Sequence, residues 1–380
     1  MKLYYNHLFR SSVFAVLLFC FCINNLSAGV ERYTEKTRRI NKEFDVNSDA
    51  TVEIENRFGK VHINTWEENR VELSIEIIVQ DRNEDRASDR LDDIDIEIDA
   101  TSNLVTVRTL IDDNWESKGF QFSFTEMTNW IFGEDDNRKI EINYTLSMPA
   151  TNHLDLENFY GDTYIDDLSG NALLNIKYGA LHAEKLTGSK TKLFLGYGSG
   201  EIKEIRNANI EVRYSSLEID KCETMDLESK YTKVEIDQVD ELDAEVKYGE
   251  LDIESVINIE GELKYVGFEL GELLNDADLI VGYGPTFEID FISKDFESID
   301  IEANFTSVHL NFEEGSQFEL DAEASFGDID VDDDLDPNAN RARDDEGHTT
   351  ELRFDVGGHN PSKTVKIDVS YGNIELGLDR

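Results

Sequence analysis

The sequence predicts an all-β repeat protein, a single-stranded parallel β-helix (β-solenoid) with coils of about 17–22 residues. An aromatic residue, usually Tyr followed by Gly, recurs at nearly constant spacing, and short runs of alternating apolar and polar residues flank it. Four successive steps between Tyr197 and Tyr265 are 17 residues each. A unit this short cannot bury an apolar face alone, so copies must stack on one another.

The aromatic landmarks extend through most of the chain. The series is Phe58, Tyr160, Tyr178, Tyr197, Tyr214, Tyr231, Tyr248, Tyr265, Tyr283, Phe305, Phe326 and Tyr371. Steps beside the regular centre are 18 or 19 residues, later steps are 22 and 21, and the last step is 45.

Alignment on the aromatic residue gives a pattern of apolar positions two and four residues before it and three, five and eight after it. Around Tyr214 these positions hold Ile210, Val212, Leu217, Ile219 and Cys222. Such alternation predicts short strands with one buried face. We predict that the aromatic column also points inward, with Tyr231 stacked on Tyr214 and Tyr248 in the core. The glycine that often follows is predicted to supply the positive φ of a corner.

Two other β architectures share this period. A left-handed hexapeptide β-helix would place apolar residues at multiples of six, which is not the observed pattern. A meander of antiparallel hairpins stays open, although the Asn-Gly and Asp-Gly turns typical of tight hairpins are missing.

The two ends of the chain depart from the repeat. Residues 1–28 have a positive start, an apolar run and small residues at the end, as in a secretory signal peptide. Residues 29–150 are predicted to hold N-terminal coil(s) and capping strands, with a helical turn near residues 85–91 and a loop insertion at 112–138. The regular β-solenoid follows at 151–331, then an acidic loop insertion at 332–350 and the last coil at 351–380. The strand edge of that last coil is predicted to be uncapped, which would permit end-to-end self-association.

Composition limits the partners. The 82 acidic and 36 basic residues give a net charge of −46, which argues against nucleic acid and anionic lipid as ligands. No apolar segment of membrane length follows the signal, so no stable membrane span is expected. Only Cys222 remains after signal removal, so no intramolecular disulfide is expected despite export.

Stacking converts each repeat position into a column of charge. Bases stand one residue before the aromatic, as in Arg213 and Lys230, and acids stand three before it, so the two columns are predicted to pair. The acids four residues after the aromatic are predicted to lack basic neighbours; they are Glu201, Glu218, Glu235, Asp252 and Glu269. Such a column is either a solvated face or a weak Ca²⁺ site, and the sequence leaves both open.

No constellation of residues points to catalysis. His62, His182 and His309 share the position four after the aromatic but lie in distant coils. The acidic run at 328–334 lacks the glycine and the distal glutamate of an EF-hand loop. We therefore assign no catalytic, cofactor or metal residue and predict that the protein is not an enzyme. The alternative is a carbohydrate-active β-helix enzyme that acts on polysaccharide.

Three segments resemble a known family. Residues 56–63 (NRFGKVHI), 144–149 (YTLSMP) and 156–170 (LENFYGDTYIDDLSG) are similar to the bacterial exported "putative adhesin" domains of unknown function, common in Bacteroidetes-like organisms. The resemblance implies a β-helical fold and export, and it brings no functional residues. The predicted function is an acidic surface for adhesion or partner binding in the periplasm or at the cell surface. The expected partner is an envelope protein or a glycan.

Overall fold

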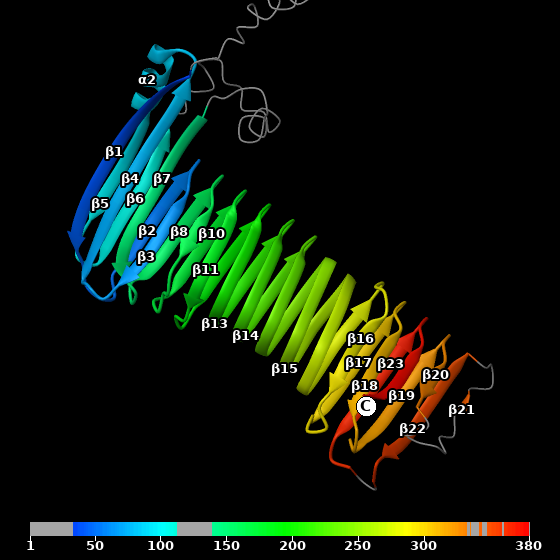
Figure 1. Cartoon of the computed structure of the whole chain (residues 1–380). Helices are drawn as coiled ribbons and strands as arrows, with labels where there is room; N and C mark the ends of the chain where they lie inside the picture. The colour runs from blue at the N-terminus through cyan, green and yellow to red at the C-terminus, as the bar shows by residue number, and fades with distance from the viewer. Residues whose placement is uncertain are drawn as a thin grey trace, which may run out of the picture.

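The computed structural model describes residues 33–111, 139–332, 335, 342–343, 348–358 and 361–379. The predicted signal, the insertion at 112–138 and most of the insertion at 332–350 lie outside these residues. The described chain is an elongated body made almost entirely of strands, which confirms the all-β part of the predicted fold class (Figure 1). Its 24 described strands belong to a single sheet.

The N-terminal section combines antiparallel and parallel strands. Its strands are β1 (Thr34–Asp45), β2 (Thr51–Arg57), β3 (Val61–Trp66), β4 (Arg70–Asp81), β5 (Ile94–Ala100), β6 (Leu104–Ile111) and β7 (Lys139–Pro149). Strands β1, β4 and β7 form an antiparallel group, and β5 pairs antiparallel with β6. The helical turn expected near residues 85–91 is confirmed as α2 (Glu84–Asp92), whose N-cap Asn83 accepts a hydrogen bond from the Arg86 N–H.

The regular array follows. Its strands are β8 (His153–Phe159), β9 (Thr163–Ile165), β10 (Ala172–Lys177), β11 (Ala180–Leu186), β12 (Thr191–Gly196), β13 (Ser199–Arg213), β14 (Ser216–Lys230), β15 (Lys233–Gly282), β16 (Phe287–Ile292), β17 (Ser298–Asn304) and β18 (Val308–Glu313).

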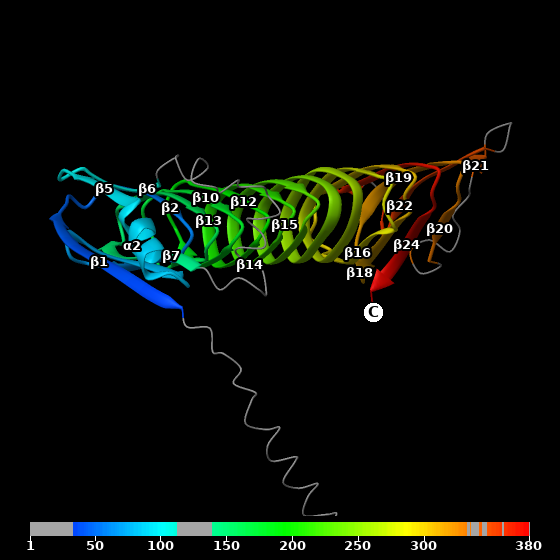
Figure 2. The ribbon, with the colours of Figure 1, turned by 90° about the horizontal axis from the view of Figure 1, so that it is seen from above.

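Strands of the array pair in parallel with the next copy of the repeat. Each paired residue of β13 lies opposite the residue 17 positions later in β14, and β14 pairs with β15 in the same way. Seen from above, the chain winds through successive stacked coils (Figure 2). The alternative of a hairpin meander is therefore wrong for this part of the chain.

The C-terminal section is built differently from the prediction. Its strands are β19 (Phe318–Ser325), β20 (Ile329–Val331), β21 (Ala342–Arg343), β22 (Thr349–Val356), β23 (Thr364–Ser370) and β24 (Ile374–Asp379). The coil of β23 and β24 is not outermost, because β23 lies between β17 and β19 and β24 between β18 and β20. Strand β22 then pairs antiparallel with β19. The predicted open edge on the last coil is thus wrong, since that coil has a partner on both sides.

The N-terminal end has the same arrangement. Strand β2 lies between β6 and β8, and β3 between β7 and β9. At each end, therefore, a coil lies inside the stack while chain distant in sequence covers it. These long-range pairings protect the backbone edges that a simple stack would expose.

One continuous apolar core fills the stacked coils. The predicted inward positions before and after the aromatic are buried; around Tyr214 they are Ile210, Val212, Leu217, Ile219 and Cys222. A further inward column, six residues before the aromatic, escaped the sequence analysis; it includes Ala208, Met225, Leu242, Ile259 and Ala277. Small and large residues share this column, which hides its apolar character in the sequence.

Cys222 provides a test of the inward alignment. Its side chain is fully buried, and burial raises the pKa of the thiol to about 12. Because the thiolate is the reactive form, we expect native protein to react with a thiol reagent at least 100-fold more slowly than unfolded protein. The measurement is the labelling rate with and without denaturant. Comparable rates would place Cys222 on the surface.

Candidate binding surfaces

The aromatic residues of the repeat form a solvent-facing stack along the body, here called the aromatic ladder. In spatial order its members are Phe58, Tyr160, Tyr178, Tyr197, Tyr214, Tyr231, Tyr248, Tyr265, Tyr283, Phe305, Tyr371 and Phe326. Tyr231 stacks on Tyr214 and Tyr248 as predicted, with ring centroids 4.9 and 5.0 Å apart. The predicted inward orientation is wrong, because Tyr231 is 50% exposed.

The reason lies in the backbone at the corner. All twelve ladder residues have positive φ, between 52° and 65°. A left-handed residue interrupts the alternation of a strand, so the inward series does not continue through the aromatic position. The aromatic residue itself makes the corner, and the prediction that the following glycine does so is wrong.

The following glycine has a different role. A Cβ at Gly161 would lie 1.8 Å from the carbonyl oxygen of Gly59 in the neighbouring coil, and one at Gly179 would lie 2.1 Å from that of Gly161. At these two positions, glycine is therefore required by the close approach of neighbouring backbones. Where Ser215 or Thr232 replaces glycine, its hydroxyl accepts a hydrogen bond from an N–H of the preceding coil, at 3.2 and 3.4 Å respectively.

At each ladder position the cost of a left-handed backbone conformation opposes the gain from aromatic stacking, and the two free energies are of similar size. A left-handed conformation costs a non-glycine residue about 1–2 kcal/mol. Stacking of each aromatic pair contributes about 0.5–1.5 kcal/mol beyond its buried area. The rings thus offset the strain of the corners as long as the ladder is continuous.

Ion pairs flank the ladder on one side, as predicted. Arg213, one residue before Tyr214, lies 2.6 Å from Glu211 in its own coil and 3.4 Å from Glu228 in the next. Lys230 lies 2.8 Å from Glu228. The bases beside the ladder therefore sit between carboxylates of their own and adjacent coils, and these charges largely cancel.

The acidic column on the other side is not free of bases, contrary to the prediction. Lys233 pairs with Glu235 in its own coil and lies 3.3 Å from Asp252 in the next. The hydrogen bonds that Lys233 donates to these carboxylates raise its pKa. Lys233 lies two residues before Glu235 on the same strand, so their side chains share one face. The sequence analysis did not consider a base at this position.

Histidines lie at both ends of this acidic column. His182 Nδ1 is 3.2 Å from Glu201 Oε2, and His309 Nδ1 is 3.2 Å from Glu288 Oε1. The structure also brings His62 and His182, distant in sequence, onto opposite faces of the Tyr164 ring, at 4.5 and 5.1 Å. Desolvation is the main cause that lowers the pKa of His62. His309 lies many coils away from this three-ring stack.

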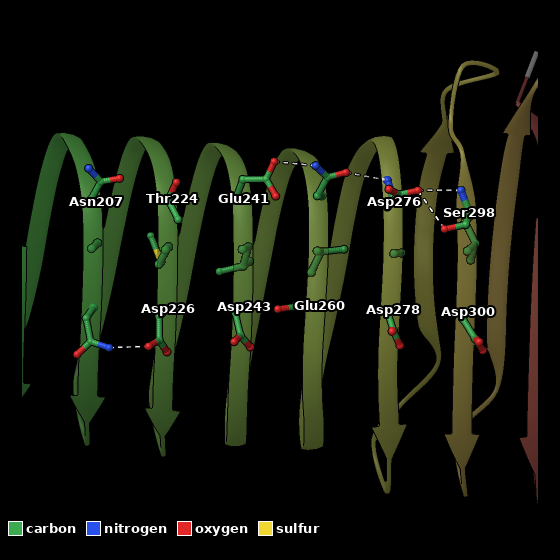
Figure 3. Close-up of a pocket in the computed structure, with 18 of the residues that line it drawn as sticks. Asn207, Thr224, Asp226, Glu241, Asp243, Glu260, Asp276, Asp278, Ser298 and Asp300 are labelled. Atoms are coloured by element: carbon green, nitrogen blue, oxygen red, sulfur yellow. Dashed lines mark hydrogen bonds between the residues drawn. The ribbon is translucent and has the colours of Figure 1, made fainter. Parts of the chain in front are cut away.

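A long groove, here called the acidic groove, crosses the outer face of the coils and has a volume of about 1190 Å³. Two rows of outward side chains line it (Figure 3). The polar row comprises Asn207, Thr224, Glu241, Asn258, Asp276 and Ser298. The acidic row comprises Asp226, Asp243, Glu260, Asp278 and Asp300. Between the rows lie residues of the inward column that the sequence analysis missed, whose side chains point into the core.

The two rows differ in how their charges are satisfied. In the polar row, Asn258 donates to Glu241 at 2.7 Å, and the backbone N–H of Asp276 donates to Asn258 at 3.1 Å. The acidic row has partners at its ends, where Asn209 donates to Asp226 at 2.6 Å and Lys366 lies 3.2 Å from Asp300. Within the described part of the chain, its three central acids, Asp243, Glu260 and Asp278, form no ion pair. The groove therefore attracts cations. The ladder lies about 16 Å away across five strand residues and has compensated charge along one of its two sides.

Like-charge crowding has a measurable consequence at Asp155, which occupies the acidic row's position in an earlier coil. Burial, followed by the charges of Glu53, Glu157 and Glu55, raises the pKa of Asp155 in the folded state. A raised carboxyl pKa lowers stability above that pKa, and the loss disappears as pH falls towards the unfolded value of about 3.9. We expect Asp155→Asn to raise the free energy of unfolding at pH 7 by up to about 0.5 kcal/mol.

Denaturant unfolding of wild-type protein and Asp155→Asn at pH 7 and near pH 4 tests this expectation. The difference should shrink at the lower pH, where the wild-type carboxyl becomes protonated. A variant that is less stable than wild type at pH 7 would contradict the assigned sign.

Neither a metal centre nor a membrane helix emerges from the described residues. They contain no group of three or more His, Cys, Asp or Glu side chains placed to hold a metal ion. Within the same ranges, no helix combines the length and the apolar character needed to cross a bilayer.

Comparison with known proteins gives distant structural likenesses. Neither a family model nor a curated protein matches the chain. A putative cell adhesion protein from Clostridium sporogenes is 11% identical, with 92% of this chain and 100% of that chain covered and a TM-score of 0.19. A putative lipid binding protein from Parabacteroides distasonis is 8% identical, with 90% of this chain and 96% of that chain covered and a TM-score of 0.31. A putative adhesin from Bacteroides fragilis is 11% identical, with 89% of this chain and 97% of that chain covered and a TM-score of 0.22. Two of these structures are named as adhesion proteins, like the family that the sequence resembles. TM-scores of this size carry no argument about fold, ligand or activity.

Proposed function

We propose that this protein is an exported, non-enzymatic β-solenoid that presents an ordered surface for adhesion or partner binding in the cell envelope, in the periplasm or at the cell surface. The solenoid assignment is supported by the parallel pairing of β13, β14 and β15 with a constant 17-residue offset. Stacked coils of this kind are quasi-one-dimensional and offer long, regular surfaces for binding.

The aromatic ladder is the observation that supports a binding role. Its central tyrosines, from Tyr197 to Tyr283, are 45–51% exposed. The backbone conformation does not call for an aromatic residue, because glycine or asparagine adopts positive φ at lower cost. Exposed aromatic surface of this extent is typical of interaction sites, where tyrosine supplies contact area and a polar hydroxyl together.

Sedimentation with isolated cell envelopes tests the proposal. The chain from residue 29 to 380 should bind envelopes saturably, and replacing Tyr214, Tyr231 and Tyr248 together with Ser should weaken binding at least 10-fold. The matched control replaces three acids of the groove, Asp226, Asp243 and Asp278, with Asn and should bind as wild type does. Circular dichroism checks that all variants are folded. Equal binding by the serine variant and wild type would overturn the proposal.

The second candidate function is a carbohydrate-active enzyme, and one specific observation bears on it. His182 and Glu201 form a hydrogen-bonded pair at a shallow hollow of about 400 Å³ that also contains Lys233 and Glu235. A histidine–carboxylate pair is the unit from which general acid–base catalysis is built. If the protein cleaved polysaccharide there, reducing ends would accumulate with wild-type protein and would be lost with His182→Ala. We expect no release from either protein.

A further inference from the structure

We propose that the aromatic ladder binds an extended, uncharged β-1,4-linked glycan that lies parallel to the long axis of the stacked coils. The inference rests on the proposed binding function and names the ligand class. Four features carry it: the spacing of the ladder, the hydroxyl groups of its tyrosines from Tyr197 to Tyr265, the neutral strip on one side of the ladder and the acidity of the whole chain.

The first feature is the repeat distance. Neighbouring ring centroids are 4.7–5.5 Å apart along the ladder, with interplanar angles of 2–17°. One sugar of an extended β-1,4-linked chain advances by close to the distance between stacked strands, about 4.8 Å. Over several coils, successive sugars can therefore lie beside successive rings. An extended peptide advances about 3.3 Å per residue and cannot keep that register.

The second feature is the chemistry that the ladder offers to solvent. Each inner ring has both faces covered by its neighbours, so the ring edge and the phenolic hydroxyl remain for a ligand. In the part of the chain that the structure describes, the hydroxyls of Tyr197, Tyr214, Tyr231, Tyr248 and Tyr265 form no hydrogen bond. A phenolic hydroxyl both donates and accepts, which matches the hydroxyl groups of a sugar. A row of such groups, one per coil, is a repeating site for a repeating polymer.

The third feature is the neutral strip along one side of the ladder. Arg213, Lys230 and Lys247 are each paired with glutamates of their own or adjacent coils. These bases are therefore not available as an unpaired row for the carboxylates or sulfates of an acidic polymer.

The fourth feature is the net charge of −46, which repels polyanions over the whole surface. Because the strip beside the ladder is neutral and the chain as a whole is acidic, the ladder should bind an uncharged polymer in preference to an anionic one. Because the ladder continues over twelve rings, affinity should increase with the length of the glycan, as in multivalent binding.

A hydroxyl-deletion variant tests the proposal without breaking the ladder. The variant replaces Tyr214, Tyr231 and Tyr248 with Phe, which keeps the rings and removes three adjacent hydroxyls. Wild-type protein should sediment with microcrystalline cellulose and should bind soluble cellohexaose more tightly than cellotriose in calorimetry. The phenylalanine variant should bind at least 10-fold more weakly while its melting temperature stays within a few degrees of wild type. The groove variant with Asp226, Asp243 and Asp278 replaced by Asn should bind cellulose as wild type does.

Two results would overturn the glycan proposal. One is equal binding of cellulose by wild type and the phenylalanine variant; the other is failure of wild type to bind cellulose and cellohexaose. Preference for alginate, a polyanionic polymer, would also contradict it. If envelope binding depends on the ladder but is abolished by protease treatment of the envelopes, the adhesion function stands and the ligand is a protein.

Discussion

Phe312→Ala should lower the free energy of unfolding by about 3–5 kcal/mol, because it removes one ring from a cluster of three buried aromatic side chains. The Phe312 side chain is fully buried and packs against the rings of Phe296 and Phe318, with centroid distances of 5.9 and 4.5 Å. All three rings lie near the C-terminal end of the stack, where the inserted coil must be held between its neighbours. Removing one ring takes away the buried area and leaves a cavity that the surrounding strands cannot close.

Tyr231 provides the comparison for this experiment. Tyr231→Ala loses two stacking contacts at a half-exposed site and should cost about 1–3 kcal/mol. Tyr231→Gly should be less harmful than Tyr231→Ala by about 1 kcal/mol, because glycine tolerates the φ of 55° at this corner. Chemical denaturation of the three variants measures these differences. If Tyr231→Ala is as costly as Phe312→Ala, the ladder is part of the core.

Gly161→Ala should be similarly damaging for a steric reason and should cost about 3 kcal/mol or more. The added Cβ would lie 1.8 Å from the Gly59 carbonyl oxygen and 2.4 Å from its carbonyl carbon. Both are backbone atoms of the neighbouring coil, so relief requires the coils to move apart and to weaken the parallel pairing of β3 with β9. The glycine column that continues through Gly179 and Gly198 makes the same close approach from coil to coil.

Gly267→Ala is the matched control. This glycine lies two residues after Tyr265, and a Cβ there would meet only the Glu250 Cγ, at 3.5 Å. Its cost should be within about 1 kcal/mol of zero, because no backbone approach is blocked. Thermal unfolding followed by circular dichroism measures both variants. Equal melting temperatures for Gly161→Ala and Gly267→Ala would show that the coils can separate at little cost.

Within each coil, short-range pattern determined most of what the sequence could predict. Alternation at Ile210, Val212, Leu217 and Ile219 identifies strands and their buried faces, because side chains of a strand alternate between two sides. The 17-residue period identifies the repeat, and the pairing of Arg213 with Glu211 follows from their shared outward face. The pattern did not reveal the inward column of Ala208 and Met225, because alanine is too small to stand out as a core residue.

The candidate surfaces depended on features that no local pattern contains. The ladder points outward because positive φ at each tyrosine interrupts the alternation, and apolar periodicity carries no information about φ. The groove is lined by side chains from many successive coils, so it depends on how neighbouring coils match and not on the pattern within one coil.

The order of coils at the ends was also decided by tertiary structure alone. Strand β23 inserts between β17 and β19, and β2 inserts between β6 and β8. Each insertion pairs strands that are tens of residues apart in sequence, and the repeat pattern is the same whichever neighbour a coil chooses. What distinguishes the choices is the protection of exposed strand edges, a property of the assembled stack.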